Sequence, residues 1–304
     1  MLEKISRKIT KRSIQISLGV LWLIDGLLQL QPKMFTTDFA HKVINPAASG
    51  QPIFVAGPMH LAMTLLLHQP FLFNLCFATT QLVIGFLILK KKTIRYGLIG
   101  SIIWGLSVWY LGEGLGGLAG GHATLFMGAP GAALIYAIIS MAVLPSRNND
   151  NQGRPANWLA YVWMTIWLGS VPLILWSQTT YRGLSSMLLS MTKGAPGWLA
   201  HLDKSSGTYV ASTGNWFILF IIILSLVAGF MVILPGYYFR LAAVCVGIIL
   251  SLAYWIVGQN LGTFYSGIAT DPNTGPLLIL LGIAILGSPN IKINAFSKSL
   301  VFLD

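Results

Sequence analysis

Two acids and a histidine interrupt the apolar parts of this chain. Asp25 stands inside the apolar run 13–31, while Glu113 and His122 lie in the glycine-rich stretch 109–131, WYLGEGLGGLAGGHATLFMGAPG. An ionisable side chain within a membrane is costly and is a candidate functional residue by default. Carboxyl and imidazole groups in a partly dry site can hold and transfer protons near neutral pH. We therefore predict a catalytic acid–base site of Asp25, Glu113 and His122, with Glu113 pointing into an outer-facing cavity.

Aromatic and histidine side chains near these acids are the candidates for cofactor binding. They are Trp104, Trp109, Tyr110, His60 and His68. His60 and His68 are separated by about 80° around a helix and about 12 Å along it, so one helix cannot direct both at one ion. We predict no metal site, although four methionines on the outer side are possible soft copper ligands; packing explains them better: Met34, Met59, Met63 and Met127.

Each residue of the acid–base site also has a structural alternative. Asp25 could bond to a neighbouring helix, Glu113 could cap backbone N–H groups, and His122 could be an ordinary loop histidine. The glycines of 109–131 could likewise serve only close packing and positive φ angles. The cavity prediction separates these alternatives, because it requires Glu113 to lie close to Asp25 and to one of His60, His68 or His122.

The composition places these residues in an integral membrane protein. Hydrophobic residues make up 55% and charged residues 9% of the 304 residues, whereas soluble domains carry about 25% charged residues. The net charge is +11, and the Lys and Arg residues are distributed along the chain in a pattern typical of membrane topology. We therefore expect the lipid bilayer, and no nucleic acid, as a partner. Two cysteines in apolar runs, Cys76 and Cys245, form no disulfide framework.

Eight apolar segments approach the roughly 20 residues of helix that a bilayer crossing needs. They are 13–31, 69–89, 95–113, 125–145, 157–177, 214–235, 238–258 and 274–289. The apolar segment 52–67 is shorter and contains Gly57-Pro58, so we expect an interfacial or re-entrant helix there. With the N-terminus inside, only five of the 19 basic residues fall in outer segments: Lys33, Lys42, Arg182, Lys193 and Lys204. The positive-inside rule then predicts a multi-pass protein of the cell membrane with both termini in the cytoplasm.

The sequence also contains an internal repeat. Segment 109–124 aligns with 255–270 without a gap, an offset of 146 residues that also aligns Pro130 with Pro276. Two units with four spans each insert the same way up, as in transporters with parallel repeats. We predict an all-α integral membrane protein of eight transmembrane helices in two tandem four-helix units. The first unit is 1–150 and the second is 151–304.

The repeat compares the two units residue by residue. Glu113 aligns with Gln259, His122 with Ile268, and Asp25 with about Ser170. The ionisable residues are therefore concentrated in the first unit. We predict that the site lies in the first unit and that the second unit is degenerate or structural.

The first apolar run and its exit, SLGVLWLIDGLLQLQPKMF (17–35), resemble the opening of the DoxX/DoxD-like membrane protein family. The family is built of four-helix units, which matches the predicted plan of this chain twice. Some of its members are membrane subunits of a thiosulfate:quinone oxidoreductase. The resemblance implies a quinone-linked role, and it assigns no catalytic residue to Asp25, Glu113 or His122.

Three functions follow as hypotheses. The first is a membrane subunit of a quinone-linked oxidoreductase, in which the acids and aromatic residues surround a quinone head group. A partner subunit would then supply the redox centres, since the sequence contains no haem motif, cysteine cluster or dinucleotide fingerprint. The second is a structural subunit of a larger membrane complex. The third is a transporter of a metal or a small solute, or a metal-handling protein.

Overall fold

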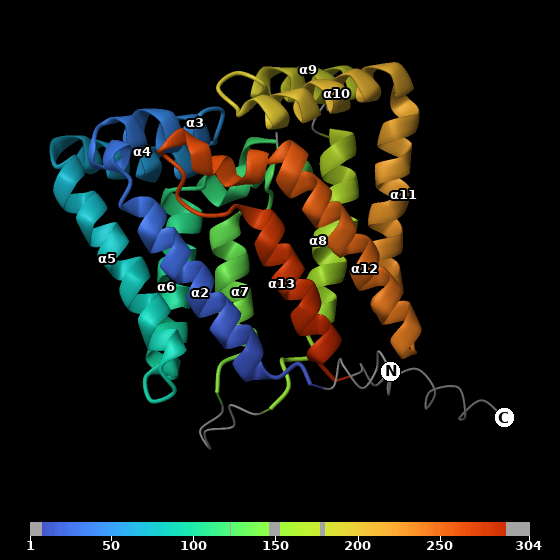
Figure 1. Cartoon of the computed structure of the whole chain (residues 1–304), viewed down its shortest axis with the longest axis horizontal. Coiled ribbons are helices and arrows are strands. Elements are labelled where there is room, and N and C mark those ends of the chain that lie inside the picture. The colour runs from blue at the N-terminus through green and yellow to red at the C-terminus, as the bar shows by residue number, and fades with distance from the viewer. Residues whose placement is uncertain (1–7, 122, 146–152, 177–179, 290–304) are drawn as a thin grey trace.

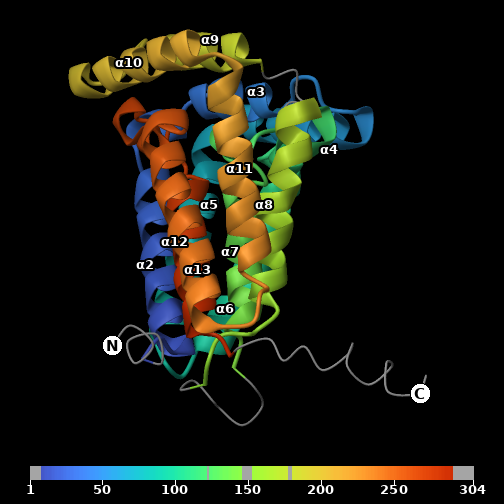
Figure 2. The same cartoon turned by 90° about the vertical axis from the view of Figure 1, so that its right-hand side faces the viewer.

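The computed structural model describes residues 8–121, 123–145, 153–176 and 180–289. Every regular element in these ranges is helical, so the predicted all-helical class is confirmed. Eight apolar helices run side by side through the molecule (Figures 1 and 2). They are α2 (Lys11–Gln29), α5 (Pro70–Leu89), α6 (Ile94–Leu111), α7 (Ala132–Ala142), α8 (Leu159–Trp176), α11 (Asn215–Met231), α12 (Tyr237–Ala253) and α13 (Thr274–Gly287).

The apolar helices indicate a lipid bilayer environment, and among the described residues they differ in length. Three are long and apolar enough to cross a bilayer, namely α5, α6 and α12 with its continuation to Ser266. The helices α7, α8 and α13 are apolar but shorter. α7 begins only after an irregular segment, so it is shorter than the run 125–145 predicted from sequence. α13 begins at the first residue of the predicted run 274–289 and ends two residues before its end.

Four helices lie across one end of the bundle, at the top of Figure 1. They are α3 (Asn45–Ala48), α4 (Ile53–His68), α9 (Tyr181–Met191) and α10 (Gly197–Thr213). The expectation for 52–67 agrees with α4, which does not run alongside the long helices (Figures 1 and 2). α10 meets α11 at a bend of 102°. We call this end the upper end of the bundle.

Basic side chains cover helix ends at the lower end. The Arg12 guanidinium donates hydrogen bonds to the carbonyls of Ile88 and Leu89 at the end of α5. The Arg240 guanidinium donates to the carbonyls of Ser288 and Pro289 just beyond α13, each at 3.1 Å. These contacts satisfy carbonyls that a helix terminus leaves unpaired and place positive charge at the negative end of the helix dipole.

One large hydrophobic cluster contains residues from both halves of the chain. Trp22 and Tyr136 belong to the same buried cluster as Trp163, Trp167 and Leu277. The Trp22 and Tyr136 rings lie 4.3 Å apart between centroids. The boundary predicted near residue 150 therefore divides the sequence but does not divide the core.

Matching hydrogen bonds occur in the two halves. The indole N–H of Trp109 donates to the Pro130 carbonyl at 2.7 Å, and that of Trp255 donates to the Pro272 carbonyl at 2.7 Å. The contacts therefore match Pro130 with Pro272, not with Pro276. The connection in the second half is shorter by four residues, which an ungapped alignment cannot show.

The glycine-rich segment after α6 also has a counterpart after α12. Leu115, Gly116 and Gly117 have left-handed backbones, as do the residues 261–263. At Gly116, where φ is +63°, a side chain would overlap the carbonyl group of Pro130. At Gly117, where φ is +77°, the nearest atom to an added Cβ is the Ala123 Cβ at 3.6 Å.

The two glycines give a matched pair of substitutions. We expect Gly117→Ala to lower the free energy of unfolding by about 1–2 kcal/mol, the cost of a left-handed non-glycine residue. Gly116→Ala adds overlap with backbone atoms that cannot move aside, so its thermal midpoint in detergent should be clearly lower than that of Gly117→Ala. Equal midpoints for the two variants would contradict the tight packing of Gly116 on Pro130.

Candidate functional site

A cavity of about 220 Å³ lies near the upper ends of α2, α5, α6 and α7. Most of its wall is apolar and aromatic, from Trp22, Phe39, Leu66, Phe77 and Val108. Three acids also line it, and these are Asp25, Glu113 and Asp271. A concave apolar site with a few convergent polar groups is the usual form of a small-molecule site.

Glu113 follows the end of α6 and closes the start of α7. Its Oε1 accepts a hydrogen bond of 3.0 Å from the backbone N–H of Ala133, in the first turn of α7. The structural alternative of a capping role is thus correct for this oxygen. The second oxygen, Oε2, is buried without a hydrogen-bond partner. Gly131, with φ of +109°, leaves the space that Oε2 fills.

Burial makes the Glu113 carboxyl a weaker acid than an exposed glutamate. Its pKa is raised from 4.5 to about 8, first by the loss of hydration and second by the nearby Asp271 carboxyl. The backbone N–H groups of Ala133 and Ala132 oppose this shift. A carboxyl with this pKa can both hold and release a proton near neutral pH.

Asp271 comes from the second half of the chain and was missed in the sequence analysis. Thr270 Oγ1 donates to its Oδ2 at 2.6 Å, and the Asn273 N–H donates to its Oδ1 at 2.7 Å. Burial raises its pKa, against the effect of these two bonds. Ungapped alignment placed Asp271 opposite Leu125, an apolar residue. Only the shorter connection before Pro272 brings this acid to the cavity, so the prediction of a site within the first unit alone is corrected.

Asp25 lies deeper in the cavity wall, on α2. Its side chain is 1% exposed, and Oδ1 has no hydrogen-bond partner. The carboxyl interacts electrostatically with Asp271 more strongly than with Glu113. The Tyr136 hydroxyl faces it, but that hydroxyl makes no hydrogen bond of standard geometry. The structure thus places Asp25 and Glu113 on one cavity.

Further polar atoms of the cavity wall are also buried without partners. Gln29 donates to Asn74 Oδ1 at 2.6 Å, which leaves Gln29 Oε1 unbonded. Gln81 Oε1 and Trp104 Nε1 are unbonded as well. Including Asp25, Glu113 and Tyr136, six lining residues carry such an atom. Few buried polar groups in folded proteins lack a partner, so their convergence on one cavity indicates that water or a ligand completes them.

The structure corrects the position of four predicted site residues. Trp109 and Tyr110 do not line the cavity, because their side chains hold the backbone in place through the Pro130 and Phe54 carbonyls, each at 2.7 Å. His60 and His68 are exposed on α4. Neither therefore meets Glu113, which leaves His122 as the remaining histidine of that expectation. Trp104 lines the cavity. His122 lies outside the described residues.

The cavity lies close to the surface of the bundle and to a second cavity. Its wall includes Ala62 and Leu66 of α4 and Ser107 and Leu111 of α6, and Ser107 and Leu111 are also exposed. At the upper end it borders a second cavity of about 400 Å³, the vestibule, which the glycine-rich segment and Gln51 help to line. Glu113 and Asp271 line both cavities.

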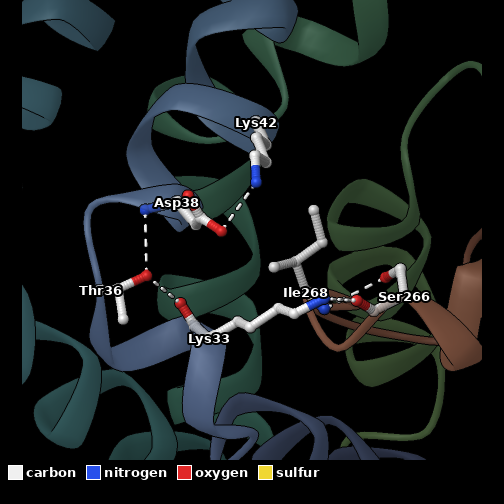
Figure 3. A network of polar contacts seen from close by, with 6 residues as sticks. All are labelled: Lys33, Thr36, Asp38, Lys42, Ser266 and Ile268. Atoms are coloured by element: carbon white, nitrogen blue, oxygen red, sulfur yellow. Dashed lines mark hydrogen bonds and ion pairs between the residues drawn. The ribbon is translucent and has the colours of Figure 1, made fainter.

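A hydrogen bond joins the segment after α2 to the second half of the chain (Figure 3). Lys33, in the segment after α2, donates from Nζ to the Ser266 carbonyl at 2.9 Å. Lys42 forms an exposed ion pair of 2.8 Å with Asp38 in the same segment. The Lys33 contact thus joins the segment after α2 to the one that precedes Asp271.

No family model, no curated protein and no solved structure matches this chain. Among the described residues, no group of three or more His, Cys, Asp or Glu residues is arranged to hold a metal ion. The chemistry of the site therefore rests on its own geometry, with three carboxyl groups, the Tyr136 phenol and the indoles of Trp22 and Trp104 around an apolar cavity.

The acidity of Glu113 predicts how stability depends on pH. The folded protein holds this proton up to about pH 8, whereas the unfolded chain releases it near pH 4.5. The unfolded state thus binds fewer protons between these values, so the free energy of unfolding should fall as the pH rises through this range. Glu113→Gln should reduce this fall, as measured by thermal midpoints in detergent across that range.

Asp38→Asn is the matched control for this measurement. Asp38 is exposed, and its bond to Lys42 lowers its pKa, so its titration ends below this pH range. An unchanged pH dependence in Glu113→Gln would show that this carboxyl is ionised throughout and would contradict its buried position.

Proposed function

We propose that this protein binds a quinone in the cavity and acts as the membrane subunit of a quinone-linked oxidoreductase. One observation carries the proposal. Unpartnered hydrogen-bonding atoms converge on an apolar cavity whose wall includes residues of α4 and exposed residues of α6. A quinone combines an apolar ring and tail with two carbonyl oxygens and reaches its sites from within the bilayer. It needs hydrogen-bond donors and proton-transferring groups in such a pocket.

The cavity residues suit the polar part of that ligand. Trp104 Nε1 and the Tyr136 hydroxyl are buried donors without acceptors. Glu113, with a pKa of about 8, can donate or accept a proton near neutral pH. Asp25 and Asp271 provide further acids on the same wall. These groups can orient a quinone head and exchange protons with it, while electrons would come from a partner subunit that supplies the redox centres.

The proposal includes the predicted architecture. We infer eight crossings in two tandem units that resemble the DoxX/DoxD-like family, with the upper end outside and both termini in the cytoplasm. The paired contacts of Trp109 and Trp255 support the repeat. So does the packing of Gly85 against Leu23, which Gly229 and Leu168 reproduce. The basic residues at the lower end support the orientation.

Transport is a second candidate, favoured by a separate observation. Buried polar contacts continue from the cavity toward the lower end. Trp22 Nε1 donates to Ser101 Oγ at 2.8 Å, and Ser140 Oγ donates to the same oxygen at 2.7 Å. A proton leak through vesicles that contain the protein would favour this candidate over the first.

Quinone binding can be tested with a ubiquinone analogue that has a short tail. Because Trp22 and Trp104 line the cavity, the analogue should quench tryptophan fluorescence. Ala62→Phe fills the cavity and should weaken binding about tenfold or more, since overpacking costs about 1–3 kcal/mol and 1.4 kcal/mol is tenfold in affinity. Leu61→Phe is the control, since Leu61 is 65% exposed and outside the lining. No saturable quenching, or equal weakening by both variants, would refute the proposal.

The orientation is testable by labelling single cysteines in a Cys76→Ser/Cys245→Ser background. Lys193→Cys, at the upper end, should react in intact cells with a thiol reagent that does not cross membranes. Lys92→Cys, in the turn between α5 and α6, should react only after permeabilisation. Labelling of Lys92→Cys in intact cells would reverse the proposed orientation.

A further inference from the structure

The cavity and the vestibule share one acidic wall. The cavity is mostly apolar, whereas polar residues of the vestibule include Ser49, Gln51, Thr124 and Asn273. Asp25 and Tyr136 line only the cavity, and Glu113 and Asp271 line both spaces. A proton that moves between the vestibule and the deep end of the cavity therefore has these two carboxyl groups beside its path.

Asp271 is the better placed of the two to pass a proton inward. One oxygen of Glu113 is occupied by the N-terminus of α7. Asp271 sits on an irregular segment, held only by Thr270 and Asn273, and it interacts with Asp25 more strongly than Glu113 does. The titratable groups that face Asp271 are Asp25 on α2, Glu113 after α6 and Tyr136 on α7. Among the described residues, no basic side chain lines either cavity, so none of them supplies a cation that would hold Asp271 ionised.

We propose that Asp271 is the proton-transfer residue that connects the vestibule with the deep end of the quinone cavity. The carboxylate of Asp271 takes a proton from water in the vestibule, and the acid form passes that proton toward Asp25 or Glu113. Asp271 returns to its carboxylate form, so one proton has moved inward and no electrons have moved. This inference rests on the proposed quinone site, whose protons would then be exchanged at the upper end of the bundle.

The competing hypothesis is a proton route between Asp25 and the lower end of the bundle. This route would pass Ser101 and Ser140, whose hydroxyls are hydrogen-bonded to each other and buried. These two serines lie away from the vestibule. Substitution of Ser140 therefore tests the lower route without changing the acidic wall.

Hydrogen–deuterium exchange at the Asp25 carboxyl distinguishes the routes. The full-length protein in lipid nanodiscs is transferred to D₂O at a pH low enough to protonate Asp25, and infrared spectroscopy follows the carboxyl carbonyl band. The band lost in Asp25→Asn identifies the group. We expect Asp271→Asn to slow its exchange about 100-fold, a typical contribution of a positioned proton-transfer group. Asp271→Glu should restore fast exchange, and Ser140→Ala should leave it unchanged.

Each outcome decides the proposal. Slow exchange in Asp271→Asn alone supports it, whereas unchanged exchange, or equal slowing by Ser140→Ala, overturns it. If Asp271→Asn fails to fold, Asp271→Ala is measured in its place with the same expectation. Asp38→Asn, an exposed acid at the upper end, controls for charge. The assay contains no quinone, so its result is separate from the quenching test of the proposed function.

Discussion

Two helices that begin inside the bundle place the strongest constraint on this structure. α7 has 11 residues and α13 has 14, and each follows a segment whose backbone turns left-handed. Their first N–H groups lie in apolar surroundings, where an unpaired backbone group costs several kcal/mol. The side-chain oxygen Oε1 of Glu113 accepts a hydrogen bond from one such N–H group in α7. Oε1 of Gln259 does the same in α13. These side chains therefore fix the geometry of both irregular segments.

The choice of capping residue separates the two halves chemically. A glutamine cap and a glutamate cap accept the same hydrogen bond, each at 3.0 Å here. Only the glutamate leaves a second oxygen that can carry a proton. Glu113 therefore serves two purposes, because capping holds its carboxyl in place while burial shifts its pKa toward neutrality. The structural and functional interpretations of this residue are both needed.

The site also depends on the shared core. Because residues of both halves pack into one cluster, the segment before α13 lies against the start of α7. The second half thereby contributes Asp271 to a cavity whose other acids come from the first half. If the second half only supported the first, the cavity would contain two acids, Glu113 and Asp25. The observed wall contains a third, Asp271.

Local properties of the sequence were enough to predict the helices and two of the acids. Apolar runs locate the eight apolar helices to within a few residues, except where α7 starts late. The cost of an ionisable group in apolar surroundings singled out Asp25 and Glu113. Internal alignment further indicated that the loops after α6 and α12 have one form, since glycine and left-handed turns leave a sequence pattern.

Only the tertiary structure decided which side chains meet. Asp271, Gln81 and Tyr136 come from three separate segments, and no spacing along the chain links them to Asp25. His60 and His68 are near the acids in the predicted topology, yet the orientation of α4 leaves them exposed. A four-residue difference in one connection brought Asp271 to the site. Hydrophobicity is a property of each residue and can be read locally, whereas a cavity depends on the relative positions of several helices, which side-chain packing sets.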